Sequence, residues 1–139
     1  MKKLVIISFT ILCSLSLFSQ NITVVFSQNK CGFDIEELNK FWTEQAVPIL
    51  NDLVAQEKLI GWGVLTHAWG DEWNWNVYYT AASQNAFNDA WSEFIKIMME
   101  KDPETFKTFS KFCFEHKDSI YTQIMSSDDT DDVEDTDGN

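Results

Sequence analysis

The chain has 139 residues, of which 22 are acidic and 10 are basic, and its formal net charge is −12 at neutral pH. This length suits one domain with a single hydrophobic core, and it excludes two domains of ordinary size. Every basic residue is lysine, and the lysines are scattered along the chain. Because a nucleic-acid-binding surface needs clustered positive charge, this composition argues against nucleic acid as a partner.

The first 20 residues predict an export signal. Lys2 and Lys3 precede the apolar run LVIISFTILCSLSLF, which is shorter than the roughly 20 residues that a spanning helix needs. We therefore expect residues 1–20 to be removed and Cys13 to be lost with them. The mature protein is expected to be secreted or periplasmic and to have no membrane contact.

Residues 21–126 are predicted to form the folded domain, beginning with a strand over Ile22–Gln28. A helix is predicted from Asp34, where Asp34 and Glu37 resemble a capping box. Pro48 should kink or split this helix because proline removes a backbone donor. Its apolar stripe comprises Ile35, Leu38, Trp42, Ala46, Ile49 and Leu53.

The stretch from Gly61 to Tyr79 predicts a β-hairpin with strands Ile60–Trp69 and Glu72–Ala81. The two-residue loop Gly70-Asp71 places Trp69 opposite Glu72. One predicted face, the core side, carries Trp62, Val64, Thr66, Ala68, Trp73, Trp75, Val77 and Tyr79. The other face carries Gly61, Gly63, Leu65, His67, Trp69, Glu72, Asn74, Asn76, Tyr78 and Thr80.

The second half of the domain predicts two helices and a final strand. The first of these helices starts at about Ser83 or Asn85 and ends at Asp102-Pro103, and Asp102 then caps the next helix. The last strand is predicted over Ser119–Met125. The inward residues are Phe87, Trp91, Phe94 and Met98 in the longer helix, and Phe106, Phe109, Cys113 and His116 in the shorter one. Residues 127–139 are acidic and are expected to be a disordered tail.

The element order β-α-β-β-α-α-β predicts an α+β fold of the ferredoxin-like kind, with a four-stranded antiparallel sheet and helices on one face. In that topology the last strand lies beside the first. Cys31 and Cys113 flank the point where these two strands meet, so a disulfide between them is expected in an oxidising compartment. The alternative is a pair of free buried thiols.

Three segments carry a resemblance to the dimeric α+β barrel superfamily. They are WxxxxVPIL from Trp42, GWGVLTHAWGDEWNWNVYYTA from Gly61 and FNDAW from Phe87, within a match over Ile22–Met125. The resemblance implies a ferredoxin-like subunit and a homodimer in which two helix-free sheet faces pair to form a barrel. The superfamily includes quinone-forming monooxygenases, haem-degrading enzymes, stress-responsive barrel proteins and uncharacterised exported relatives.

The chain departs from the haem-degrading members, which resemble one another in an Asn, a Trp and a helix-borne His that act together. His116 is predicted on the third helix, but no matching trio can be placed. A structural or solvated role for His116 is favoured over a haem or metal ligand, because no second ligand lies at a suitable spacing. No metal and no cofactor are therefore expected.

The candidate site is the polar face of the hairpin. His67, Asn76 and Tyr78 are the candidate catalytic residues, since these groups could orient a substrate and move a proton. The candidate ligand-binding residues are Gly61, Gly63, Asn74 and Trp69. The alternative is a polar barrel interior or dimer seam in which the glycines accommodate Tyr78, with the exposed Trp69 and Trp73 as contacts at its rim.

Three functional hypotheses remain open. The leading one is an exported homodimeric barrel that binds a small apolar or aromatic molecule. The second is a cofactor-independent monooxygenase or isomerase acting on a small aromatic substrate through His67, Asn76 and Tyr78. The third is an interaction role for the acidic tail after Ser127.

Overall fold

The computed structural model describes residues 22–32, 34–67, 69–70 and 72–126. The predicted export signal and acidic tail lie outside these ranges. No helix within the described ranges is long and apolar enough to cross a membrane. The elements are β1 (Thr23–Cys31), α1 (Ile35–Gln45), α2 (Val47–Ala55), β2 (Gly61–Thr66), β3 (Trp75–Ala81), α3 (Gln84–Lys101), α4 (Thr105–Phe112) and β4 (Cys113–Thr122).

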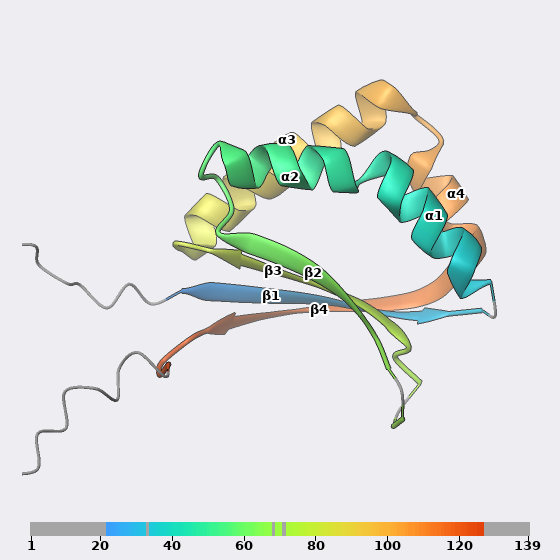
Figure 1. Cartoon of the computed structure of the whole chain (residues 1–139), viewed down its shortest axis with the longest axis horizontal. Helices are drawn as coiled ribbons and strands as arrows, with labels where there is room; N and C mark the ends of the chain where they lie inside the picture. The colour runs from blue at the N-terminus through green and yellow to red at the C-terminus, as the bar shows by residue number, and fades with distance from the viewer. Residues whose placement is uncertain (1–21, 33, 68, 71, 127–139) are drawn as a thin grey trace, which may run out of the picture.

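The four strands form one sheet in the order β2-β3-β1-β4, and every neighbouring pair is antiparallel. The helices cover one face of this sheet and leave the other face without a helix (Figure 1). The chain therefore has the predicted α+β, ferredoxin-like architecture, and β4 lies beside β1 as expected.

The predicted register of the hairpin is confirmed. Trp62 pairs with Tyr79, Val64 with Val77, and Thr66 with Trp75. Because side chains alternate along a strand, this register turns Trp75, Val77 and Tyr79 toward the helices, and all three are 1% exposed or less.

The ladder is shorter at the hairpin tip than predicted, because β2 ends at Thr66 and β3 begins at Trp75. Trp73 was predicted on the core side, and this is wrong: its ring lies 4.3 Å from the ammonium nitrogen of Lys117. The Asn74 side chain accepts from the Cys31 N–H at 2.8 Å and donates to the Cys31 carbonyl at 2.9 Å. These bonds tie the chain to the end of β1, so Trp73 lies beyond the regular alternation of β3.

The first predicted helix is split in two at Ala46, with Pro48 in the first turn of α2. Proline is tolerated there because the backbone N–H groups of a first turn have no partner within the helix. The predicted capping box is wrong, since Asp34 makes no side-chain cap bond and its ψ of 52° is not extended. The predicted stripe is otherwise confirmed, with Leu38, Trp42, Ala46, Ile49 and Leu53 all buried.

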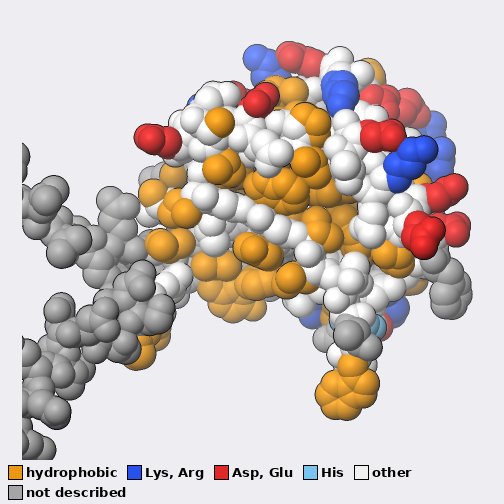
Figure 2. Space-filling model, viewed as in Figure 1, with side chains coloured by type: hydrophobic (Ala, Val, Ile, Leu, Met, Phe, Trp, Pro, Cys, Tyr) orange, Lys and Arg blue, Asp and Glu red, His pale blue; other side chains and the backbone are white. Residues whose placement is uncertain are grey.

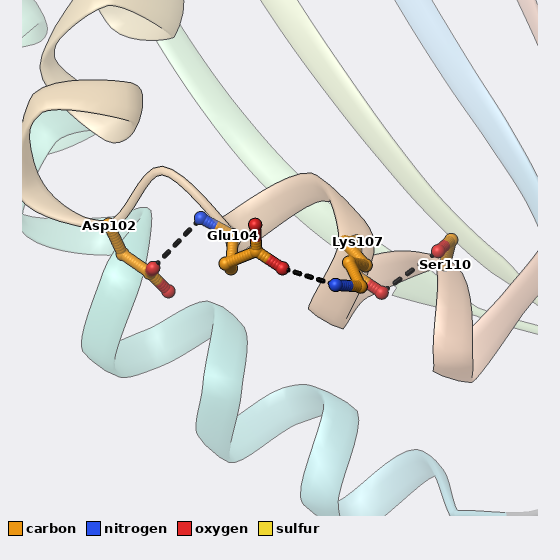
Figure 3. Close-up of polar contacts among 4 residues, drawn as sticks. All are labelled: Asp102, Glu104, Lys107 and Ser110. Carbon is orange, nitrogen blue, oxygen red and sulfur yellow. Dashed lines mark hydrogen bonds and ion pairs between the residues drawn. The ribbon is translucent and has the colours of Figure 1, made fainter.

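Helix α3 begins after Ser83, whose hydroxyl accepts a hydrogen bond from the Ala86 N–H at 3.1 Å. The turn that follows α3 is held by the Asp102 carboxylate, which accepts from the Glu104 N–H at 3.0 Å. Lys107 forms an ion pair with Glu104 at 2.6 Å, and the Ser110 hydroxyl donates to the Lys107 carbonyl (Figure 3). The N-cap of α4 is Glu104 rather than the predicted Asp102, and it makes no side-chain cap bond.

The end of α4 differs from the prediction. The helix stops at Phe112, and His116 lies on β4 rather than on a helix. Strand β1 also continues beyond Gln28 to Cys31. The cause is the ladder between β1 and β4, which runs from Thr23↔Thr122 to Cys31↔Cys113, since long-range pairing overrides local helical spacing. Phe106 was predicted to face inward, but 41% of its surface is exposed.

Cys31 and Cys113 form a disulfide, as predicted. It joins the end of β1 to the start of β4, next to the bond from the Gly32 N–H to the Phe112 carbonyl at 2.9 Å. The alternative of two free thiols is therefore wrong.

Candidate functional site

A cavity of about 370 Å³ lies between the helices and the β1–β4 side of the sheet. We call it the helix–sheet cavity. Its apolar walls come from α1, α3 and α4 and from the first residues of β4, and they include Phe41, Trp42, Trp91, Phe106, Phe109 and Phe114. Small-molecule sites in proteins are commonly concave, mostly apolar and of this order of volume.

Polar side chains form the strand side of the helix–sheet cavity. Ser27 pairs with Asp118, and Asn29 pairs with His116, across the β1–β4 ladder. Paired residues on neighbouring strands project from the same face of a sheet, and all four line the cavity. The sheet therefore presents a hydroxyl, an amide, an imidazole and a carboxylate to the aromatic wall opposite.

A register shift in β4 decides which residues reach this face. The pairs Lys30↔Glu115 and Cys31↔Cys113 leave Phe114 as the extra residue of a β-bulge. Strict alternation would turn Cys113 and His116 to opposite faces of the sheet. The bulge lets both line the cavity, and it leaves Phe114 63% exposed at the rim.

Two buried polar atoms of the lining residues have no hydrogen-bond partner among the described residues. They are Nε1 of Trp42, a residue that is 8% exposed, and Oγ1 of Thr105, which is 1% exposed. By contrast, Nε1 of Trp75 donates to Asn39 at 2.9 Å. Buried polar groups in proteins are usually satisfied, so these two atoms are exceptions. Both atoms are fully buried, so neither is open to the space of the cavity.

The hydroxyl of Tyr79 is a third buried group without a partner among the described residues. Burial strongly raises the pKa of Tyr79, and the negative charge of Asp118 raises it further. Tyr79 is therefore a neutral phenol at physiological pH.

None of the site residues predicted from the sequence lines the helix–sheet cavity. Gly61, Gly63, Asn76 and Tyr78 lie on the opposite, helix-free face of the sheet, whereas His67, Trp69 and Asn74 lie in the hairpin tip between β2 and β3. The amide of Asn74 is bonded to the backbone of Cys31. Asn76 accepts from the Asn29 N–H at 3.3 Å and donates to the Trp73 carbonyl at 3.0 Å. The side chains of both asparagines are therefore hydrogen-bonded to backbone groups at the end of the sheet.

The space above Gly63 is filled by Tyr78. A Cβ atom on Gly63 would lie 2.4 Å from Cε1 of Tyr78, whereas one on Gly61 would lie 3.4 Å from the Thr80 hydroxyl. This packing favours the interpretation in which glycine accommodates a cross-strand aromatic ring. His67 is exposed, and Trp69 at the hairpin tip is 93% exposed.

A second hollow, of about 390 Å³, lies between α1, α2 and β2 and is lined by Trp42, Val47, Trp62 and Val64 among others. Figure 2 shows hydrophobic side chains at the surface in this band between the front helices and the hairpin. Trp42 lines both spaces. Within the described ranges, no group of three or more His, Cys, Asp or Glu side chains is placed to hold a metal ion.

The sequence did not mark Ser27, Asn29 and Asp118 as site residues, and it placed His116 on the inward side of a helix rather than on a strand. A signal was present on β1 as alternation, because Ser27 and Asn29 continue the period of two set by Thr23 and Val25. Asn29 and Asp118 lay just outside the predicted strands, which ended at Gln28 and began at Ser119. The bulge at Phe114 further broke the alternation that would have identified the early part of β4.

The fold and the cavity together define a ferredoxin-like α+β subunit with a pocket between helices and sheet. Among solved structures, it is similar to a dimeric ferredoxin-like protein from an uncultured marine organism, with a TM-score of 0.61 and 12% identity over 76% of this chain and 89% of that chain. A NIPSNAP family protein from Agrobacterium tumefaciens matches with a TM-score of 0.60 and 13% identity over 75% and 87% of the two chains. SnoaB, a cofactor-independent oxygenase from Streptomyces nogalater, matches with a TM-score of 0.55 and 8% identity over 77% and 97% of the two chains.

The chain thus has the ferredoxin-like fold that the sequence resemblance implied. Identities this low show a shared fold and leave the chemistry to the site itself. No protein-family model matches the sequence, and no curated protein matches it.

Proposed function

We propose that this protein is an exported, homodimeric barrel protein that binds a small, mainly apolar or aromatic molecule in the helix–sheet cavity. The observation that carries the proposal is the cavity itself, in which aromatic walls face a few polar groups on the β1–β4 ladder. This arrangement is typical of ligand sites, in which apolar walls provide affinity and a few polar groups orient the ligand.

Filling the cavity floor should block binding. Ser27→Leu places a branched side chain on the helix-facing side of β1, and we expect it to weaken binding of the apolar probe N-phenylnaphthylamine by about tenfold or more, because the floor no longer accommodates the ring. Probe emission measured in a titration checks this.

The matched control is Ser92→Leu. Ser92 is exposed on α3 and is not among the residues that line the cavity, so the same substitution there should leave probe affinity unchanged. Equal binding by wild type and Ser27→Leu, with both folded by circular dichroism, would contradict the proposed site.

The homodimer is proposed from the helix-free face of the sheet. Tyr121 and Leu65 are 54% and 46% exposed on this face, and Phe26 packs between Tyr78 and Tyr121 with ring centroids 6.1 Å from each. No helix of the described chain covers these side chains (Figure 1). Exposed apolar patches commonly mark interaction surfaces, and the similar marine protein is described as dimeric. We infer that a second copy covers this face.

Phe26→Lys should convert the dimer to a monomer, because a lysine in the middle of this face places two like charges at the proposed two-fold interface. Met99→Lys is the control, since Met99 is 39% exposed on α3, away from the sheet. Sedimentation velocity gives the masses. A wild-type monomer, or a Phe26→Lys dimer of unchanged affinity, is incompatible with the proposal.

Export is proposed from the leader-like residues 1–20 and is supported by the Cys31–Cys113 disulfide, since disulfides persist mainly in oxidising compartments. The mass of the mature protein purified from the producing cells reports whether residues 1–20 have been removed.

The alternative of a cofactor-independent monooxygenase or isomerase has the support of fold similarity to SnoaB alone. The contacts of Asn76 and Tyr78, two of the candidate catalytic residues, do not favour this alternative. Asn76 uses both ends of its amide on backbone groups, and Tyr78 fills the space above Gly63. Ligand binding in the helix–sheet cavity is therefore the function that the geometry supports best.

A further inference from the structure

We propose that the helix–sheet cavity selects a cationic amine with an aromatic body, and that Asp118 is the counter-ion for the ammonium group. This inference rests on the proposed function, because it names the class of ligand for the same site. It is carried by the charges that line the cavity, by the partners of those charges and by the aromatic wall that faces them.

The charge balance of the lining is negative. Asp118 and Glu115 line the cavity, and no lysine of the described chain does. Glu115 has a partner outside the cavity, because its carboxylate lies 3.6 Å from the ammonium nitrogen of Lys30. Asp118 makes no hydrogen bond or ion pair with any residue that the structure describes, so its carboxylate is available to a positive group on a ligand.

Asp118 lies at the exposed edge of the cavity. It sits on the helix-facing side of the β1–β4 ladder, opposite Ser27. Its charge contributes to the raised pKa of the buried Tyr79, after the larger effect of burial itself. The carboxylate is therefore placed to meet the ammonium group of a ligand that enters the cavity from solvent.

The aromatic wall favours an aromatic ligand body. Trp42 and Trp91 line the cavity, and such rings pack against other aromatic rings. Phe87 and Phe94 stack on Trp91, so the wall contributes packing and the preference for a cation comes from Asp118. An anionic ligand would meet the Asp118 carboxylate, and no lysine among the described lining residues would offset that repulsion.

The test compares three probes of similar shape: naphthylmethylamine, naphthylmethanol and naphthoate. Titration calorimetry on the intact protein should rank them amine, then alcohol, then carboxylate, with the amine at least about tenfold tighter than the carboxylate. Asp118→Asn should lower amine affinity to that of the alcohol and leave alcohol affinity within about twofold. Asp118 is exposed, so this substitution is compatible with folding.

Asp89→Asn is the matched control, because Asp89 is an exposed carboxylate on α3 that does not line the cavity. It removes the same net charge and should leave the ranking unchanged. If the amine preference survives in Asp118→Asn, or falls equally in Asp89→Asn, the preference comes from the overall negative charge and the inference is overturned.

The outcomes also separate this inference from the proposed function. Suppose that the alcohol binds and that the carboxylate binds as tightly as the amine or more tightly. This result overturns the cationic ligand class and leaves the cavity as a binding site. If none of the three probes nor N-phenylnaphthylamine binds, the proposed function itself fails and the inference fails with it.

Discussion

Replacement of Trp75 by alanine is expected to lower the free energy of unfolding by about 3–5 kcal/mol, the usual cost of deleting a large buried aromatic side chain. Trp75 is 0% exposed. Its ring makes an edge contact with Trp42 at 5.2 Å and a tilted contact with Phe109 at 5.8 Å. Its Nε1 also donates to Asn39 at 2.9 Å, so the variant loses packing and a hydrogen bond together.

Urea unfolding followed by far-ultraviolet circular dichroism measures this loss without relying on tryptophan emission. The matched control is Trp69→Ala, in the same hairpin, because Trp69 is 93% exposed. We expect that variant to stay within about 0.5 kcal/mol of wild type. Similar losses in the two variants would contradict the assignment of the two tryptophans to core and surface.

The second large effect is expected from the disulfide. The double variant Cys31→Ala/Cys113→Ala should be less stable than the oxidised protein by about 4 kcal/mol, because the bridge closes a long loop and restricts the unfolded chain. The two cysteines are 82 positions apart in the sequence. Equilibrium denaturation of the oxidised protein and of the double variant measures the difference.

Reductant supplies the internal control for this prediction. Treatment with dithiothreitol should destabilise the wild type and leave the double variant unchanged, since that variant has no bridge to reduce. A double variant as stable as the oxidised wild type would show that the bridge contributes nothing to stability. The comparison also bears on the cavity, because Cys113 lines it and precedes the bulge at Phe114.

The hairpin and the first helical segment could be predicted from local patterns. Alternation of indoles with small and polar residues specified the register that pairs Trp62 with Tyr79, because a slip of one residue would expose every core side chain. The spacing of Leu38, Trp42 and Ala46 likewise predicted a buried stripe. In both cases the pattern repeats over a few residues and is visible without knowledge of distant partners.

The candidate site could not be predicted in this way. Local spacing after Phe109 favoured a continuing helix through His116, but the pairing of β4 with β1 makes this segment a strand. That ladder turns His116 and Asp118 toward the helices, opposite Asn29 and Ser27. The pattern of the hairpin predicted a site among its polar residues instead, because their side chains share a face. Hydrogen bonds to the backbone occupy the amides of Asn74 and Asn76.

The sequence by itself determined the element order, the faces of the hairpin between Trp62 and Tyr79 and the neighbouring positions of Cys31 and Cys113, because short-range periodicity and topology rules suffice for these. Only the tertiary structure decided where β4 begins, where the bulge at Phe114 falls and which side chains line the helix–sheet cavity. Those features depend on hydrogen bonds between segments far apart in the chain, and the bulge at Phe114 interrupts the period of two in β4, so local spacing there favoured a helix.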